Sequence, residues 1–319
     1  MTQGLEGLKQ KIAEDMQRKL PGQRKTQRVN LSEAIATILN CRTVNTSEIA
    51  AALPRQAERM DMRYQWLLRL LDNDHIVPME VMKPYACEIL EKLMLSTDKL
   101  VLVIDQTHIN KTFEMVMVGV RIGSRAVPLA WIVKKTQGSI GFRDQAELLE
   151  AVLECIPKGA RVVLMGDRAY GTVNLIEWCQ VHKWDYRLRL KGSTATYAGT
   201  EAKPASALGP GSYHNIPITH KGIHTNLGVV HEMGHPEPWV IAMSVPVTDY
   251  KTLDYGMRWC IEAMFSDFKT RGFALESTQI KLKDHLDRLI LMVSIALYWA
   301  VSTGCWVTKN AATTHQKKL

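Results

Sequence analysis

The stretch LVLVIDQT, residues 100–107, decides the fold, because it is the first of several short apolar runs that change the character of the chain. FEMVMVGVRI at residues 113–122 and AVPLAWIVKK at residues 126–135 follow it. All three runs are rich in Val and Ile and are separated by polar or glycine-containing turns, which is typical of β-strands. We therefore expect a three-stranded antiparallel meander.

Helices and strands alternate after this meander. FRDQAELLEAVLECI (142–156) and GTVNLIEWCQVHK (171–183) have the pattern of helices, whereas ARVVLMGD (160–167) and DYRLRLK (185–191) have that of strands. Alternation of this kind predicts a mixed α/β core.

The flanking segments differ from this core. Residues 1–98 lack period-two alternation and favour short helices, whereas residues 192–248 combine many Gly, Pro and Thr residues with five of the ten histidines. We therefore expect a helical domain over residues 1–98, a core over 99–191 and 249–307, a β-rich insertion over 192–248, and a basic tail over 308–319. The motifs described below identify the first as a DNA-binding domain and the second as a catalytic core.

The composition permits a large buried core and favours an anionic partner. Of the 319 residues 46% are apolar, and 40 Lys plus Arg against 32 Asp plus Glu give a net charge of +8. A basic balance favours a polyanion without naming one. The N-terminus has no apolar signal segment, and the six cysteines form no C-x-x-C pair. We expect reduced, mostly buried thiols in a cytoplasmic, nucleoid-associated protein.

One segment is apolar enough to raise the question of a membrane. Residues 289–307, LILMVSIALYWAVSTGCWV, contain no charge and are long enough to span a bilayer. The polar residues Ser294, Ser302 and Thr303 lower the hydrophobicity of this segment, and an apolar helix also suits the core of a large domain. We favour a buried core helix and expect no membrane partner.

Within the helical segment, RQAERMDMRYQWLLRLLDND (55–74) predicts one amphipathic helix. Arg55, Arg59 and Arg63 follow at i, i+4 steps and would share one face of it. Such a stripe suits the phosphates of DNA, and a solvated helix face explains it equally well.

Two carboxylates end two of the predicted strands. Asp105 ends the first apolar run, and Asp167 ends the fourth, VVLMGD. Each alone is a weak signal because Asp is common in turns. Together, on two strands of one sheet, they indicate a site for a hard divalent cation.

The segment DYGMRWCIEAMFSDFK, within a helix expected over residues 250–272, adds a third carboxylate. At about 100° per residue, Tyr255, Arg258, Glu262 and Lys269 fall in an arc about 60° wide. Three carboxylates suit two Mg²⁺ ions, and Arg and Lys suit phosphate oxygens, so the set predicts metal-assisted phosphoryl transfer. A solvated helix face is the alternative.

The spacing Tyr255-x2-Arg258-x3-Glu262-x6-Lys269 resembles the Y-R-E-K signature of DDE transposases encoded by bacterial insertion sequences of the insertion sequence 4 group. VIDQT, GDRAYG and a β-rich insertion before the Glu agree with it. The resemblance covers about residues 28–305 and implies a ribonuclease H-like catalytic fold.

The resemblance also implies roles for the acids. Asp105, Asp167 and Glu262 would be the catalytic residues and the ligands of two Mg²⁺ ions, for which Mn²⁺ can substitute. Arg168, in the motif of the second Asp, would contact DNA. The sequence departs from the family pattern at Ala169, where relatives often have Gly, and in having no long C-terminal domain.

The other DNA contacts implied by the resemblance lie around the third acid. Tyr255, Arg258 and Lys269 would hold phosphates near the transposon end. Trp259 occupies a position where relatives place an aromatic that stacks on a displaced base. Trp239 is a second candidate for stacking by composition alone, and a core role is favoured for it.

These features predict a transposase that cuts at the ends of its insertion sequence and joins them to target DNA. Its partners would be double-stranded DNA, as terminal inverted repeats and target, and a second copy in a homodimeric synaptic complex. The alternative is a DNA-binding repressor or domesticated transposase without cleavage activity, for which a broken triad would be the sign.

A third alternative comes from HEMGH at residues 231–235, which matches the H-E-x-x-H signature of zinc proteases. That signature requires a helix, so that both His residues share one face. Gly234, Pro236 and Pro238 disfavour a helix there, and strand-like runs flank the motif. We expect a link between two strands of the insertion.

Overall fold

A single ten-stranded sheet runs through the computed structural model, which describes residues 2–55, 58–199, 201–220, 222–231 and 237–310. Its order is β3-β2-β1-β4-β5-β10-β9-β8-β6-β7. The first five strands in chain order are β1 (Lys99–His108), β2 (Phe113–Ile122), β3 (Arg125–Lys135), β4 (Arg161–Gly171) and β5 (Asp185–Leu190). β1, β2 and β3 pair antiparallel, and β1, β4 and β5 pair parallel. The predicted meander and the mixed α/β core are confirmed.

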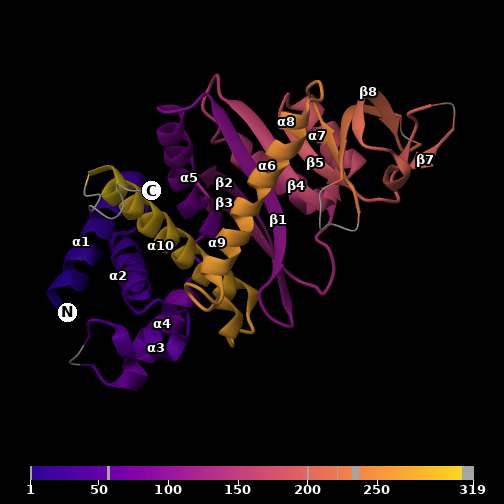
Figure 1. Cartoon of the computed structure of the whole chain (residues 1–319). Helices are drawn as coiled ribbons and strands as arrows, with labels where there is room; N and C mark the ends of the chain where they lie inside the picture. Colours follow the sequence, from indigo (N-terminus) through magenta and orange to yellow (C-terminus); the bar gives the residue numbers. More distant parts are fainter. Residues whose placement is uncertain (1, 56–57, 200, 221, 232–236, 311–319) are drawn as a thin grey trace.

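Helices cover both faces of these five strands. α6 (Phe142–Leu153) and α7 (Val173–Val181) contact each other and strands β2 to β5. On the other face, α8 (Asp249–Leu253), η2 (Asp254–Trp259) and α9 (Cys260–Phe268) form one helical rod across the sheet (Figure 1). Burial on both faces explains why β2 has eight consecutive buried residues and reads as a continuous apolar run.

Gly119 of β2 lies in close contact with the neighbouring strand β3. A Cβ added to it would lie 3.1 Å from the Val127 carbonyl oxygen and 3.2 Å from Ala126 Cβ. A side chain here would therefore press on β3, whereas Met264 Sδ of α9, at 3.5 Å, would be in ordinary contact.

The prediction of one continuous helix over residues 250–272 is wrong in detail. The six residues of η2 form a tighter 3₁₀ turn, and α9 ends at Phe268. Because a 3₁₀-helix has about three residues per turn, the 100° wheel does not describe the positions of Tyr255 and Arg258. Lys269 lies past the helix end, with φ −94° and ψ −125°, and leaves the expected stripe.

The expected insertion continues the sheet. It contains β6 (Ala195–Thr196), β7 (Lys203–Pro204), η1 (Ala205–Ala207), β8 (Gly211–Ile218), β9 (Ile223–Val230) and β10 (Trp239–Met243). β10 pairs antiparallel with β5, so hydrogen bonds join the insertion directly to the core strands. β9 and β10 are the two strands expected around HEMGH, and they pair with each other. His231 is exposed after β9, and residues 232–236 lie outside the described part of the chain.

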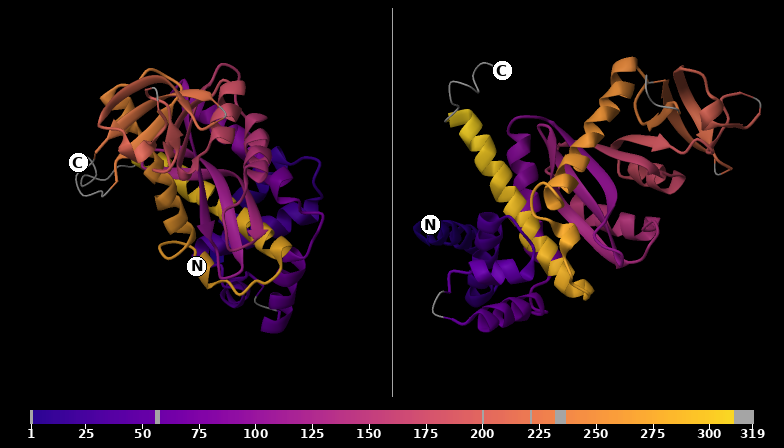
Figure 2. Two further views of the ribbon diagram at one scale, coloured as in Figure 1. Left: turned by 90° about the vertical axis from the view of Figure 1, so that its right-hand side faces the viewer. Right: turned by 60° about the horizontal axis from the view of Figure 1, so that its bottom comes forward.

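The described residues before β1 are mainly helical, with five helices where three or four short ones were expected. They are α1 (Thr2–Lys19), α2 (Lys25–Cys41), α3 (Thr46–Ala52), α4 (Met60–Leu71) and α5 (Pro78–Met94). α5 packs on β3 and β1, and one continuous set of buried apolar side chains extends from Leu5 to Tyr298. The helical part and the tip of the insertion lie at opposite ends of the molecule (Figure 2). The division into domains stays a prediction.

The prediction that Arg55, Arg59 and Arg63 share one face of a single helix is wrong. Arg55 lies before α4 in a non-helical link, Arg59 is the N-cap residue, and Arg63 alone is inside the helix. Pro54 explains why α3 ends at Ala52, because proline and the residue before it are disfavoured inside a helix. The helical pattern expected from Arg55 begins only at Met60.

The last helix, α10 (Lys283–Asn310), follows the short η3 (Leu275–Ser277) and crosses β3, α2 and α5. Residues 289–298 are buried, which confirms the core helix for this half, whereas residues 302–308 are exposed. Among the described residues, Lys283–Thr308 is long and apolar enough to cross a membrane, and half of its most apolar window is buried in the protein. The tail expected over 308–319 begins inside α10, and residues 311–319 lie outside the described part.

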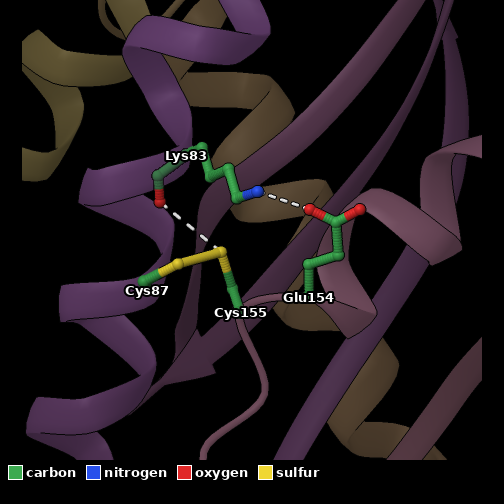
Figure 3. The surroundings of a disulfide bond; sticks show 4 residues. All are labelled: Lys83, Cys87, Glu154 and Cys155. Atoms are coloured by element: carbon green, nitrogen blue, oxygen red, sulfur yellow. Dashed lines mark hydrogen bonds and ion pairs between the residues drawn. A yellow bond between two sulfur atoms is a disulfide. The ribbon is translucent and has the colours of Figure 1, made fainter.

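The expectation that all cysteines are reduced is wrong. Cys87 of α5 and Cys155, which follows α6, form a disulfide across 68 residues of sequence (Figure 3). Lys83 and Glu154 form an ion pair beside it. No pattern of spacing marked this pair, because the two cysteines meet only when α5 and α6 pack together. Cys41, Cys179, Cys260 and Cys305 are free thiols.

Candidate active site

Two of the three predicted acids lie side by side at one edge of the sheet. In the parallel pair β1–β4 the last registered partners are Ile104 and Gly166, and Asp105 and Asp167 are the next residue on each strand. Neighbouring strands are about 4.8 Å apart, so the two carboxylates start from adjacent positions. The sequence predicted that these acids lie on two strands of one sheet, but the prediction that they end their strands is wrong. β1 continues to His108 and β4 to Gly171, because strand pairing extends past the apolar runs.

Asp105 is a buried carboxylate with an unfavourable environment for its charge. Its side chain is 17% exposed, and its Oδ1 accepts a hydrogen bond from the Gln106 N–H at 2.8 Å. Burial, followed by the charge of Asp167, raises the pKa of Asp105 to about 6, against the opposing effect of Arg258. Two carboxylates at adjacent positions repel each other, so this pair favours a bound proton or a cation.

Arg258 joins the third acid to the first. Its Nη1 donates to Asp105 Oδ2 at 3.2 Å, and its Nη2 donates to Glu262 Oε1 at 2.5 Å. Arg258 belongs to η2 and is buried, whereas the Glu262 side chain, one turn later in α9, is 56% exposed. The guanidinium therefore lies between two of the three carboxylates.

Three aromatic rings lie next to this arginine. Tyr255 and Trp239 are buried with ring centroids 5.3 Å apart, and Trp259 meets Trp239 at 5.6 Å. Trp259 is 46% exposed. Burial raises the pKa of Tyr255 to about 12, and its ring lies 5.9 Å from the Arg258 guanidinium carbon. The core position favoured for Trp239 is confirmed, and Trp259 packs against it while leaving part of its ring in solvent.

The other predicted DNA contacts are more scattered. The partly buried Lys269 side chain makes no hydrogen bond or ion pair with any described residue. Arg168 is exposed and lies 3.8 Å from Glu237. Arg55 forms ion pairs with Glu33 at 2.5 Å and with Glu58 at 3.1 Å, and its guanidinium lies over the Trp66 ring.

Arg59 and Arg63 are far from the acids in sequence and have local partners. Arg59 pairs with Asp61 at 2.9 Å, and Arg63 donates to the Ala51 carbonyl oxygen at 3.1 Å. A role for these arginines in DNA binding stays a prediction.

A polar network beside Asp105 was not predicted. Gln106 Nε2 donates to the buried Glu114 at 2.9 Å and to the Gly138 carbonyl oxygen at 3.0 Å, while the Ile140 N–H donates to Gln106 Oε1 at 2.8 Å. His108 also pairs with Glu114. The network fixes the link between β3 and α6 at the edge that bears the acids. In the sequence, the feature that could have indicated this network was Glu114, a single acid inside the apolar run FEMVMV.

The charges of this site fit a divalent cation. Among the described residues, no three His, Cys, Asp or Glu side chains converge as a ready-made metal site. Arg258 explains this, because its guanidinium is the cation between Asp105 and Glu262. Two carboxylates contact one guanidinium, and Asp167 lies at the neighbouring position on β4. Oxygen donors of this type are those that Mg²⁺ and Mn²⁺ prefer.

The family comparison agrees with this arrangement. A family model described as the transposase DDE domain matches residues 133–299, just over half of the chain. The chain belongs to the DDE transposase family. The matched part of the transposase includes Asp167, Arg258 and Glu262, and β1 with Asp105 lies before it.

Other comparisons add little to this assignment. No curated protein matches the transposase chain. Two solved structures of Marinitoga piezophila Argonaute, one with guide RNA and target DNA and one with guide RNA, share 12% identity with it at TM-scores of 0.25 and 0.22. The matches cover 76% of this chain and 37% and 35% of those chains, so this chain spans about a third of their length.

Proposed function

We propose that the protein is the transposase of a bacterial insertion sequence of the insertion sequence 4 group, which cuts at the ends of its element and joins them to target DNA. The observation that supports it best is the meeting of Asp105, Glu262 and the neighbouring Asp167 around one buried guanidinium. The strand order 3-2-1-4-5, with β2 antiparallel to β1, suits the ribonuclease H-like core that the resemblance implies.

Asp105, Asp167 and Glu262 would hold two Mg²⁺ ions, or Mn²⁺ in their place. When bound, such ions activate water or a 3′-hydroxyl and stabilise the leaving 3′-oxygen. The protein contributes by fixing the three carboxylates on β1, β4 and α9. Asp105 must lose its proton to act as a ligand, and its raised pKa makes this loss depend on pH near 6.

Arg258 has two alternative partners in this proposal. In the free protein it neutralises Asp105 and Glu262. When cations occupy the carboxylates, the guanidinium is free to bind phosphodiester oxygens, for which its planar donor geometry is well suited. The buried Tyr255 ring restricts its path, and the exposed part of Trp259 offers a surface on which a displaced base can stack.

The partners in this proposal are the terminal inverted repeats, target DNA and a second copy of the chain, in the bacterial cytoplasm at the nucleoid. The net charge of +8 favours association with DNA. Short inverted repeats in the DNA that flanks the reading frame would supply the cognate substrate.

The test is strand cleavage of a duplex that carries this cognate end, with Mg²⁺ or Mn²⁺. Asp105→Asn and Glu262→Gln should each reduce the cleavage rate by at least about 10³-fold, because lost metal ligation removes roughly 4 kcal/mol of transition-state stabilisation. Duplex binding, measured by fluorescence anisotropy, should persist. The matched control is Glu276→Gln, which alters an exposed carboxylate in η3 and should cut at the wild-type rate.

Two results would contradict the proposal. One is retained cleavage in both triad variants. The other is a wild-type protein that binds the cognate duplex and cuts it with neither metal, which would favour the repressor alternative.

A further inference from the structure

An open cavity of about 680 Å³ is lined by Arg168 of β4. Arg168 directly follows Asp167 in the chain, which connects the cavity to the acids. The other lining groups used below are Lys191, Gly192, Ser193, Ser206 and Glu237.

The cavity extends from β4, which carries Asp167, to the residues that follow β5. These strands are parallel neighbours, with Gly171 paired to Leu190, the last residue of β5. Lys191 follows immediately and therefore leaves the sheet at the same edge as Arg168. Two exposed cations thus lie close together, Arg168 on β4 and Lys191 directly after β5, and Arg168 is adjacent in sequence to Asp167.

The floor of the cavity includes a tight turn with free donors. The Thr194 N–H donates to the Lys191 carbonyl oxygen at 2.9 Å, which closes the turn. In the described structure the N–H groups of Gly192 and Ser193, between them, make no hydrogen bond. Successive unpaired N–H groups in a turn form a concave site for an anion.

The insertion holds this turn in place and adds a hydroxyl. The Ser206 N–H donates to the Gly192 carbonyl oxygen at 3.0 Å, and a Cβ at Gly192 would lie 3.3 Å from Ser206 Cβ. A side chain at position 192 would therefore require Ser206 to shift by a few tenths of an ångström. The exposed Ser206 side chain lines the cavity beside the turn.

Among the described residues, Glu237 is the one acid that lines the cavity, and its ion pair is weak. Its carboxylate lies 3.8 Å from Arg168 Nη1, with the two side chains 59% and 64% exposed. An exposed pair at this distance contributes at most about 1 kcal/mol. A phosphate can replace Glu237 as the partner of Arg168.

We propose that this cavity binds a phosphodiester group of the DNA strand that extends past the catalytic acids, held by Arg168, Lys191 and the turn at Gly192–Ser193. Glu237 opposes that phosphate and sets the strength of the contact. The inference rests on the proposed function, since a DNA strand must pass the acids for the cavity to receive it.

The experiment measures binding of a fluorescein-labelled DNA duplex without divalent ions, from about 50 to 200 mM NaCl. Lys191→Gln should weaken binding and reduce the slope of log Kd against log salt by about 0.9, the value for one lost phosphate contact. Glu237→Gln should tighten binding by about two- to fivefold, as removal of one exposed competing charge allows.

The matched control is Lys158→Gln, which removes the same charge from an exposed turn before β4, at the opposite end of that strand. It should leave the slope unchanged. A wild-type slope in Lys191→Gln, an equal loss in Lys158→Gln, or no tightening in Glu237→Gln would each overturn the cavity proposal alone. A wild-type protein that fails to bind the duplex would overturn the proposed function together with it.

Discussion

Two carboxylates with little solvent exposure have opposite surroundings in this protein. Glu33 of α2 is 3% exposed and is paired with Lys9 at 3.1 Å and with Arg55 at 2.5 Å. The Asp105 side chain is 17% exposed, shares the guanidinium of Arg258 with Glu262 and lies next to Asp167. Among the described residues, Glu33 thus pairs with two cations, whereas Asp105 and Glu262 share one.

The difference separates an ion cluster that stabilises the fold from one arranged to bind. A buried charge persists in a structural cluster when its partners neutralise it. An unbalanced group of acids with a raised pKa instead marks a site that awaits a cation, and such groups concentrate at functional sites. The Glu33 cluster holds helices together, and the Asp105 cluster is kept at some cost to stability.

The largest expected effect comes from neutralising Glu33. Glu33→Gln leaves Lys9 and Arg55 without their shared partner and should lower the free energy of unfolding by about 3–5 kcal/mol. Asp105→Asn should cost little at neutral pH, because it removes a carboxylate that repels Asp167. Urea denaturation of both variants checks this. Equal losses would remove the distinction between the two clusters.

The second prediction concerns the covalent link between the two regions. The Cys87–Cys155 disulfide joins the helical part that contains Glu33 to the sheet that contains Asp105. Replacing both cysteines by Ala should lower the free energy of unfolding by about 2–4 kcal/mol, because the bridge closes a long loop in the unfolded chain. Cys305→Ala, at an exposed free thiol, is the control. Thermal unfolding that is unaffected by the double replacement would contradict this.

The same contrast shows what the sequence could predict. The strands β1 to β5 and the adjacent positions of Asp105 and Asp167 followed from the apolar runs, because such patterns are local. The expected strand ends did not, since β1 and β4 both continue past their Asp residues. Tyr255, Arg258 and Glu262 were placed in one site by their spacing, although a 3₁₀ turn replaced the expected helix.

Features that depend on tertiary packing were not predictable in this way. Arg55 shares a spacing with Arg59 and Arg63, but its partner Glu33 is 22 residues away. Cys87 and Cys155 meet only after α5 and α6 pack together. Lys269 left the stripe because α9 ends one residue before it, a boundary that composition does not mark.

A smaller effect should appear in the pH dependence of stability. The pKa of Asp105 is raised from 3.8 to about 6 in the folded state, so its contribution to stability is fully present below pH 3.8 and is lost as pH rises through 6. Asp105→Asn has no carboxyl group to titrate and so does not lose this stability. The free energy of unfolding of the variant minus that of the wild type should therefore rise by about 2 kcal/mol between about pH 4.5 and 7.5, measured by urea denaturation. Parallel pH profiles would contradict the raised pKa.

The smallest effect is the response to a divalent cation, and it compares the clusters directly. Mn²⁺ at about ten times its Kd should stabilise the wild type by about 1.4 kcal/mol, because ligand that binds only the folded state adds RT ln(1 + [L]/Kd). Asp167→Asn should lose this gain, since it removes one of the acids around Asp105. Glu33→Gln should keep it in full, because the Glu33 carboxylate is already neutralised by Lys9 and Arg55. Thermal unfolding with and without Mn²⁺ measures all three. An equal gain in Asp167→Asn would place the cation elsewhere, and a lost gain in Glu33→Gln would mean that the balanced cluster also takes part in binding.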